Sequence, residues 1–256
     1  MLNDLLLLSG NDIPLEEIHL ILHQPTIKEI AYIGEEAFFS GCEFLRFSKE
    51  RLTSQDRSHL ENISNFEIIM SIMREKNPSV QKQKTSAMMV LSLLFPTYSI
   101  HLNFEKMSID LKQDELEFQL DKTNFDIFIQ ALNEILCLGG GESDYNPSGD
   151  LARQIADKFK EAQAKRAALV KGSQKIAILS RYISILAVGE NKDMNSLLQY
   201  TIYQLFDEFQ RYQLKCNWDM YVKSLLAGAK KEELEKVDDW MKDMHSNVDE
   251  KSQSLS

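Results

Sequence analysis

The stretch TYSIHLNFEKMSIDLKQDELEFQL, residues 97–120, decides the fold class of this 256-residue chain. Apolar and polar residues alternate in three successive short segments of it. The apolar members are Tyr98, Ile100 and Leu102, then Met107, Ile109 and Leu111, then Leu116, Phe118 and Leu120. A period of two over successive segments predicts half-buried antiparallel strands. With one more strand predicted at residues 18–23, we expect an antiparallel sheet of about four strands.

Helical patterns begin soon after the first predicted strand. Thr26 and Glu29 have the spacing of a capping box, which predicts the start of a helix over residues 27–47. This helix would contain Gly34 and Gly41, each at a cost of about 1 kcal/mol. We expect such glycines to mark the close approach of another element.

Three more helices are predicted around the strands. Asn65 is the expected N-cap of the first, and Pro78 separates it from the second, which should cover residues 80–95. The third follows the strands and should be capped by Asp121 or Thr123. Its apolar stripe consists of Phe125, Phe128, Ile129, Leu132, Ile135 and Leu136.

The glycine run Gly139, Gly140 and Gly141 separates two patterns, because every periodic segment after it is helical. Glycine permits positive φ and adds backbone entropy, so we expect a hinge at this run. The fold class is therefore predicted as α+β, with an all-helical C-terminal module. The expected division is an α+β module at 1–138, a Gly-rich linker at 139–149, a helical module at 150–245 and a polar tail at 246–256.

The helical module holds the candidate binding residues. Its helices are predicted at residues 151–169, 176–188, 194–214, 218–227 and 234–244. Six large aromatic residues in it are candidate contacts to a partner protein: Tyr203, Phe206, Phe209, Tyr212, Trp218 and Trp240. Most aromatic stripes at helical spacing are simply core, and the alternative is a groove for a partner's helix or extended segment.

Composition argues against several classes of protein. The net charge is 29 − 39 = −10, which repels phosphate backbones, so we expect no nucleic-acid partner. Three cysteines, an odd number, imply no disulfide framework and fit a reducing compartment. No apolar stretch approaches the ~20 residues that cross a bilayer, and residues 1–8 lack a basic region before their leucines. We therefore expect a cytoplasmic protein without a membrane partner.

Catalytic and metal-binding motifs are not found in the sequence. Glu142 and Ser143 follow the glycine run where a phosphate loop needs Lys and Ser or Thr. His19 and His23 would lie about 13 Å apart on a strand, too far for one metal ion. We expect no catalytic residue, no metal and no cofactor. An enzyme whose site forms only in space and a nucleic-acid binder stay as minor alternatives.

Short segments of the chain resemble one known family. They are HQPTIKEI at residues 23–30, IGE at 33–35, the charged segment 152–165 with Ile155 and Lys158, TIYQL at 201–205, and DWMKDMH at 239–245. In this order they resemble the tail assembly chaperones of long-tailed bacteriophages that infect Gram-positive bacteria. The resemblance covers roughly residues 15–245, and none of these segments is specific alone.

The resemblance implies binding and no catalysis. Such chaperones hold the helical tape-measure protein in solution until tail-tube subunits polymerise around it, and are then released. The implied partners are the tape-measure protein and tail-tube subunits, in the host cytoplasm, with the chaperone absent from the mature virion and a homo-oligomer left open. The six aromatic residues would contact the client. The alternative function is a structural virion component, such as a tail-completion or neck protein.

Overall fold

The fold of the protein is α+β, as the sequence predicted, with a helical C-terminal part. The computed structural model describes residues 2–49, 60, 62–137, 178–230, 234, 237 and 239–241. Its strands are β1 (Ile13–Leu15), β2 (Leu20–Leu22), β3 (Ser99–Asn103), β4 (Ser108–Gln113) and β5 (Leu116–Leu120). Its helices are α1 (Asp4–Ser9), α2 (Ile27–Ile33), α3 (Glu35–Leu45), α5 (Asn65–Arg74), α6 (Pro78–Leu94), α7 (Phe125–Ile135), α9 (Ile178–Gly189), α10 (Met194–Leu198) and α11 (Ile202–Leu226), with a short 3-10 turn at Glu16–Ile18.

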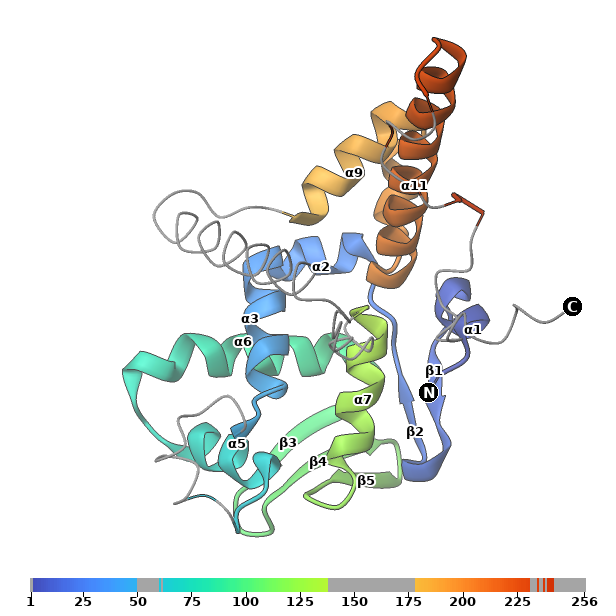
Figure 1. The fold of residues 1–256 in the computed structure, drawn as a ribbon. Helices are drawn as coiled ribbons and strands as arrows, with labels where there is room; N and C mark the ends of the chain where they lie inside the picture. The colour runs from blue at the N-terminus through green and yellow to red at the C-terminus, as the bar shows by residue number, and fades with distance from the viewer. Residues whose placement is uncertain are drawn as a thin grey trace, which may run out of the picture.

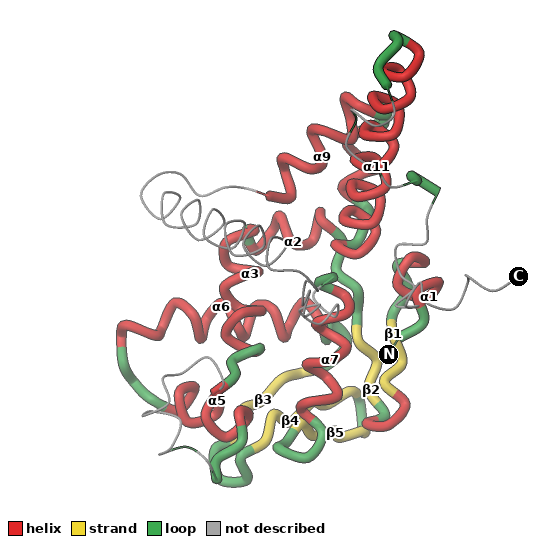
Figure 2. Tube along the Cα trace, viewed as in Figure 1, coloured by secondary structure: helices red, strands yellow, loops and turns green. Residues whose placement is uncertain are grey.

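The three alternating segments form the predicted antiparallel meander. β4 is its central strand, where Leu111 lies opposite Ile100 of β3 and Phe118 of β5. Ile109 and Leu111 are buried, as alternation on a one-sided sheet requires. Figure 2 shows these strands at one end of the molecule and the C-terminal helices at the opposite end.

The first predicted strand does not join this meander, so the expected single sheet of about four strands is two sheets. β2 pairs with β1 instead, in an antiparallel hairpin closed by the 3-10 turn, with His19 at φ +54°. Beyond β2 the backbone N–H of His23 donates to the carbonyl of Leu94 at the end of α6, 2.9 Å away. The chain therefore leaves the hairpin toward α6, and not along an edge of the meander.

The predicted helix over residues 27–47 is two helices. Gly34 ends α2 at φ +88°, a conformation that glycine adopts readily, and α3 begins at the next residue. The second glycine of the segment behaves as expected. A Cβ on Gly41 would lie 2.4 Å from the carbonyl oxygen of Ser86, so only glycine lets α3 approach α6 this closely.

Three of the predicted helix starts are displaced by one to three residues. The helix predicted from residue 80 is α6, which begins at Pro78 with Asn77 as its N-cap. The N-cap of α5 is Ser64, whose capping box with Glu67 makes Asn65 the first helical residue. α7 begins after Asn124, and not directly after Asp121 or Thr123. The carboxylate of Asp121 instead accepts hydrogen bonds from the backbone and hydroxyl of Thr123 in the turn before the helix. Polar residues cluster at the starts of α5 and α7, so more than one of them could serve as the N-cap.

The C-terminal helices differ in length from their predictions. The segment 194–214 is divided, because Thr201 caps a new helix with Gln204 and so ends α10. The expected interruption before Trp218 is absent, and α11 continues to Leu226. No glycine or proline lies inside it. The described residues of the predicted helix at 234–244 are not helical.

The helical part packs against the N-terminal part through backbone contacts near the start of α11. The backbone N–H of Ile27 donates to the carbonyl of Tyr200 at 2.8 Å, and the side chain of Gln204 donates to the carbonyl of Leu8 at 2.7 Å. Figure 1 shows α11 rising from this junction beside α2 and α1. One apolar core joins both parts, since buried residues of α9, α10 and α11 belong to the same cluster as those of α6 and α7.

Candidate functional site

The six candidate aromatic residues separate into core and surface. Tyr203 and Phe209 are only 6% and 8% exposed, so the expectation of exposed contacts does not hold for these two. The other four are half-buried: Phe206, Tyr212, Trp218 and Trp240. The expected hinge Gly139, Gly140 and Gly141 lies outside the described residues, as do residues 150–177.

Tyr203 lies at the base of α11 against the N-terminal helix. Its hydroxyl donates to the carboxylate of Asp4 at 3.4 Å. Burial, followed by the negative charge of Asp4, raises the pKa of Tyr203 above its ordinary value. This side chain therefore holds α11 to α1, and its burial inside the protein explains why it offers little surface to a partner.

Tyr182 of α9 packs against Phe206 and Phe209, two of the six candidate aromatic residues. Its ring stacks on Phe209 with centroids 3.8 Å apart and an angle of 9° between the planes. Phe206 meets the edge of the same ring at 5.5 Å. Such pairs contribute about 0.5–1.5 kcal/mol beyond area burial, so they fix α9 to the lower half of α11.

The upper half of α11 takes no part in the core. In this helix, all of whose residues are described, none after Phe209 is buried. Large apolar side chains nevertheless continue along it at spacings of four, three and four residues: Leu214, Trp218, Tyr221 and Leu225. Residues at these spacings share one face of a helix. We call these four residues the α11 stripe.

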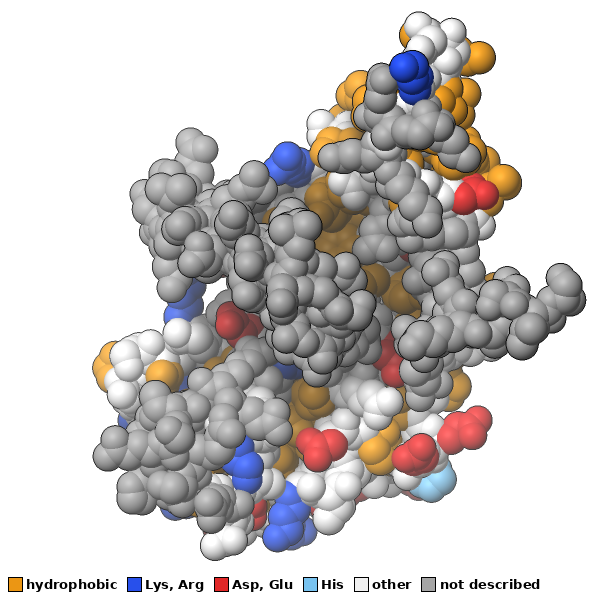
Figure 3. Space-filling model, in the orientation of Figure 1, with side chains coloured by type: hydrophobic (Ala, Val, Ile, Leu, Met, Phe, Trp, Pro, Cys, Tyr) orange, Lys and Arg blue, Asp and Glu red, His pale blue; other side chains and the backbone are white. Residues whose placement is uncertain are grey.

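The end of the arm formed by α9 and α11 has further apolar surface. Val188 and Leu226 are 82% and 83% exposed, and Met220 is 62% exposed. Figure 3 shows apolar side chains gathered over this end of the molecule, with few charged groups among them. Trp218 and Tyr221 contact each other, with ring centroids 5.9 Å apart. Apolar patches of this kind on a protein surface are typical of interaction sites.

Trp240 lies beside α11 although the sequence places it beyond the helix end. Its backbone carbonyl accepts a hydrogen bond from the guanidinium of Arg211 at 2.7 Å. The structure therefore brings together Trp240 and the upper half of α11, which also carries Tyr212 and Trp218. Leu214 and Leu225 were not singled out from the sequence, although their spacing of seven residues from Tyr221 and Trp218 is a signal that could have found them.

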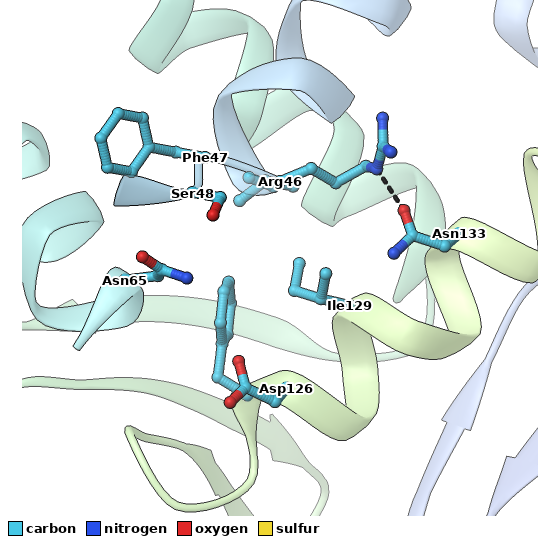
Figure 4. Close-up of a pocket in the computed structure, with 9 residues that line it drawn as sticks. Arg46, Phe47, Ser48, Asn65, Asp126, Ile129 and Asn133 are labelled. Atoms are coloured by element: carbon cyan, nitrogen blue, oxygen red, sulfur yellow. Dashed lines mark hydrogen bonds between the residues drawn. The ribbon is translucent and has the colours of Figure 1, made fainter. Parts of the chain in front are cut away.

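A polar pocket of about 210 Å³ lies elsewhere in the molecule. It lies between the end of α3, the start of α5 and one side of α7. Figure 4 shows Asn65, Asp126 and Asn133 around it, with the guanidinium of Arg46 donating to the amide oxygen of Asn133. No sequence motif links these residues, because they come from three elements up to 87 positions apart.

A second pocket, of about 300 Å³, lies between α3, α5 and α6. Phe44, Phe47, Ile69 and Ile72 give it an apolar lining, with Glu43 among its polar members. Its residues face neighbouring helices of the same body, and nothing about them resembles a catalytic arrangement. It is a shallow space where three helices meet.

All three cysteines are free thiols; Cys42 is buried, and Cys137 and Cys216 are half-buried. Burial raises the pKa of the thiols of Cys42 and Cys137 to about 12, which disfavours the reactive thiolate. Across the described residues no group of three or more His, Cys, Asp or Glu side chains is placed to hold a metal ion. Nor does any described helix have the length and apolar character needed to cross a bilayer.

Comparison with known proteins identifies one similarity. Residues 171–245 match the family model of the YomV second domain, a phage-related domain. Neither a curated protein nor a solved structure matches the chain. The match includes α9, α10, α11 and Trp240, and therefore the surface described above. The helical C-terminal part of this protein is thus similar to a phage-related domain family.

Proposed function

We propose that this protein is a non-catalytic phage tail assembly chaperone that binds the tape-measure protein through the upper half of α11. Two observations support the proposal. The segment that carries this surface matches a phage-related domain family. The short sequence segments at residues 23–35, 201–205 and 239–245 resemble those of tail assembly chaperones.

The observation that carries the proposal is an apolar face that the fold does not use. Folding buries Ile202, Leu205 and Phe209 of α11, whereas the α11 stripe contributes no buried residue. A helical client with its own apolar stripe can pack on such a face, as amphipathic helices do in grooves of their binding proteins. A holding protein needs this kind of surface and no reactive groups.

The remaining parts of the proposal follow from a holding role. The protein would act in the host cytoplasm, pass its client to tail-tube subunits, and be absent from the mature virion. The net charge of −10 favours solubility of the complex and disfavours nucleic acid as a partner. Self-association of the chaperone is left open.

Co-expression with the tape-measure protein of the same phage tests the proposal. We expect the soluble fraction of the tape-measure protein to rise several-fold in the presence of the full chain, and the two proteins to co-purify. The Trp218→Ala/Tyr221→Ala variant should lose this effect while keeping its own solubility. If the wild-type chain leaves the tape-measure protein insoluble, the proposed function is wrong.

Mass spectrometry of finished phage particles separates a chaperone from a structural component. A chaperone should be absent from purified particles, whereas a tail-completion or neck protein is present at a fixed copy number. Detection of this chain at a constant ratio to the tail-tube subunit would replace the proposed function with the structural one.

A further inference from the structure

The helix α11 continues well beyond the end of α9, its neighbour in the arm. Gly189, the last residue of α9, packs so closely on Tyr212 that an added Cβ would clash with the tyrosine hydroxyl. Leu226, at the end of α11, follows Tyr212 by 14 residues, or about 21 Å of helix at 1.5 Å per residue. Figure 1 shows this last part of α11 projecting past the end of α9.

The projecting part has an exposed side in line with α9. Lower in α11, α9 covers Phe209 through the stacked ring of Tyr182. At about 100° per residue, Asp219, Met220 and Lys223 all point within about 80° of the direction of Phe209. These three side chains are exposed, Met220 by 62%. The side of α11 that α9 covers lower down therefore continues uncovered above it.

The end of α9 adds an apolar group to this uncovered side. Val188 precedes the last residue of α9 and is 82% exposed. Together with the projecting part of α11 it forms a step on the surface of the arm. We call this step, defined by Val188, Asp219, Met220 and Lys223, the α9–α11 ledge.

The charge pattern of the ledge is complementary to itself. Asp219 and Lys223 are four residues apart, so they share one side of the helix. Two copies of α11 packed in parallel about a two-fold axis would place like charges opposite each other. Packed antiparallel, they place Asp219 of each copy opposite Lys223 of the other, with two equivalent ion pairs. Because like charges across an interface are unfavourable, this pattern selects the antiparallel arrangement.

The same register brings the tip of one arm to the end of α9 in the other copy. When Asp219 lies opposite Lys223 of the second copy, Leu226 lies opposite Cys216 of that copy. Cys216 is one turn, about 5.4 Å, beyond the residue against which α9 ends. Leu226 is 83% exposed, and in this arrangement it reaches the level of the exposed Val188.

We propose that the α9–α11 ledge is a self-association site, which joins two copies of this chain in an antiparallel dimer with two-fold symmetry. The end of α9 in each copy limits the overlap of the two α11 helices to the length that projects beyond it. Stable interfaces bury about 800 Å² per partner, and an overlap of about 21 Å of helix is short for that area. The dimer is therefore reversible, with a dissociation constant in the micromolar range.

Association through the ledge leaves the α11 stripe uncovered. The stripe residues point to the side of the helix opposite Phe209, and the ledge lies on the same side as Phe209. A dimer therefore presents two stripes, which a long helical client can bind at once with a gain in avidity. This consequence rests on the proposed function, whereas the dimer itself does not.

Sedimentation of the full chain at concentrations from about 1 to 100 μM tests the proposal, because this range spans the expected dissociation constant. We expect a monomer–dimer equilibrium. Lys223→Asp should weaken association at least about tenfold, since it places like charges opposite each other twice in the dimer. The double variant Asp219→Lys/Lys223→Asp reverses both charges and should restore association to within about threefold of the wild type.

Lys215→Asp is the matched control. It makes the same charge change at an exposed residue of α11 that lies on a different side of the helix, so association should change less than about twofold. A chain that stays monomeric over the whole range would overturn the proposal. So would equal effects of Lys223→Asp and Lys215→Asp, or a double variant no stronger than Lys223→Asp. Circular dichroism of each variant checks that the fold is retained.

Failure of this proposal is distinguishable from failure of the proposed function. If the chain is monomeric but co-expression still solubilises the tape-measure protein, the chaperone role stands and the dimer is wrong. If the dimer responds to the charge variants as expected and co-expression has no effect, the self-association site stands and the chaperone role is wrong.

Discussion

Thr26 and Thr201 pair as an antiparallel bridge, although 175 positions separate them in the chain. Each is the N-cap of a helix and each forms a capping box, Thr26 with Glu29 for α2 and Thr201 with Gln204 for α11. Two helices that belong to different parts of the chain therefore start side by side. The position and direction of the candidate binding arm are set at this bridge.

Removing the cap at Thr201 should destabilise the protein by about 1 kcal/mol, because the hydroxyl accepts from the backbone of Gln204. We expect Thr201→Ala to lower the urea midpoint accordingly, with no change in the slope of the transition. Thr201→Ser keeps the hydroxyl and is the matched control. Equal midpoints for the two variants would show that the cap contributes nothing here.

Adding one methyl group at Gly41 should destabilise the contact between α3 and α6. A Cβ at this position would meet backbone atoms of Ser86 at 2.4 and 2.6 Å, and backbone cannot move aside as a side chain can. Overpacking of this kind costs about 1–3 kcal/mol, so we expect Gly41→Ala to lower the melting temperature by several degrees. Ser40→Ala, at the neighbouring and more open position, should leave it nearly unchanged.

The stability should depend on pH through His23, which lies between two carboxylates. Its ring nitrogens contact Asp12 at 2.7 Å and Glu29 at 3.2 Å. Burial alone lowers the pKa of His23, but the hydrogen bonds to Asp12 and Glu29 outweigh it, and the pKa is raised above 6.5. A raised pKa means that this stabilisation is complete below pH 6.5 and is lost as the pH rises through the folded-state pKa.

Glu29 adds the opposite dependence at acidic pH. Burial alone raises its pKa, but hydrogen bonds from Thr26 and His23 lower it overall, so its stabilisation is lost as the pH falls through that lowered value.

Urea midpoints of the wild type and His23→Gln between pH 5 and 9 check the His23 contribution. The difference should be largest at the acidic end. A difference independent of pH would show that the protonated ring contributes nothing.

Truncation separates core aromatics from surface aromatics on α11. Phe209→Ala removes a buried ring stacked on Tyr182 and should cost about 3–5 kcal/mol. Trp218→Ala removes a half-buried ring that contacts Tyr221 and should cost well under half as much. Thermal unfolding followed by circular dichroism measures both. A larger loss for Trp218→Ala than for Phe209→Ala would reverse our division of the helix into core and binding surface.

Much of the local structure could be predicted because its causes lie within a few residues. The alternation in residues 97–120 sets the meander, and the capping box of Thr26 and Glu29 starts α2. The predictions were wrong where the same residues are compatible with two local structures. Gly34 could have continued one long helix or ended it, and in the structure it lies at φ +88°, where α2 ends and α3 begins.

The candidate site was predicted only in part, for a different reason. From the sequence, Phe209 and Trp218 were both candidate contacts to a partner protein. In the structure Phe209 is buried, whereas Trp218 is only half-buried. The difference arises because α9 supplies Tyr182 against Phe209, whereas its last residue, Gly189, lies against Tyr212, six positions before Trp218. Periodicity reports which residues share a face and contains no information about which neighbour covers that face.

The sequence by itself determined the α+β class, the meander, most helices and a net negative charge, because alternation and capping depend on residues close together in the chain and charge depends on composition alone. The tertiary structure alone decided that β2 pairs with β1, that Thr26 meets Thr201, and that Trp240 returns to Arg211. These contacts join residues that local periodicity does not relate, and each depends on the whole fold to hold its two partners in place. The same contacts decide which apolar residues of α11 are core and which lie outside it.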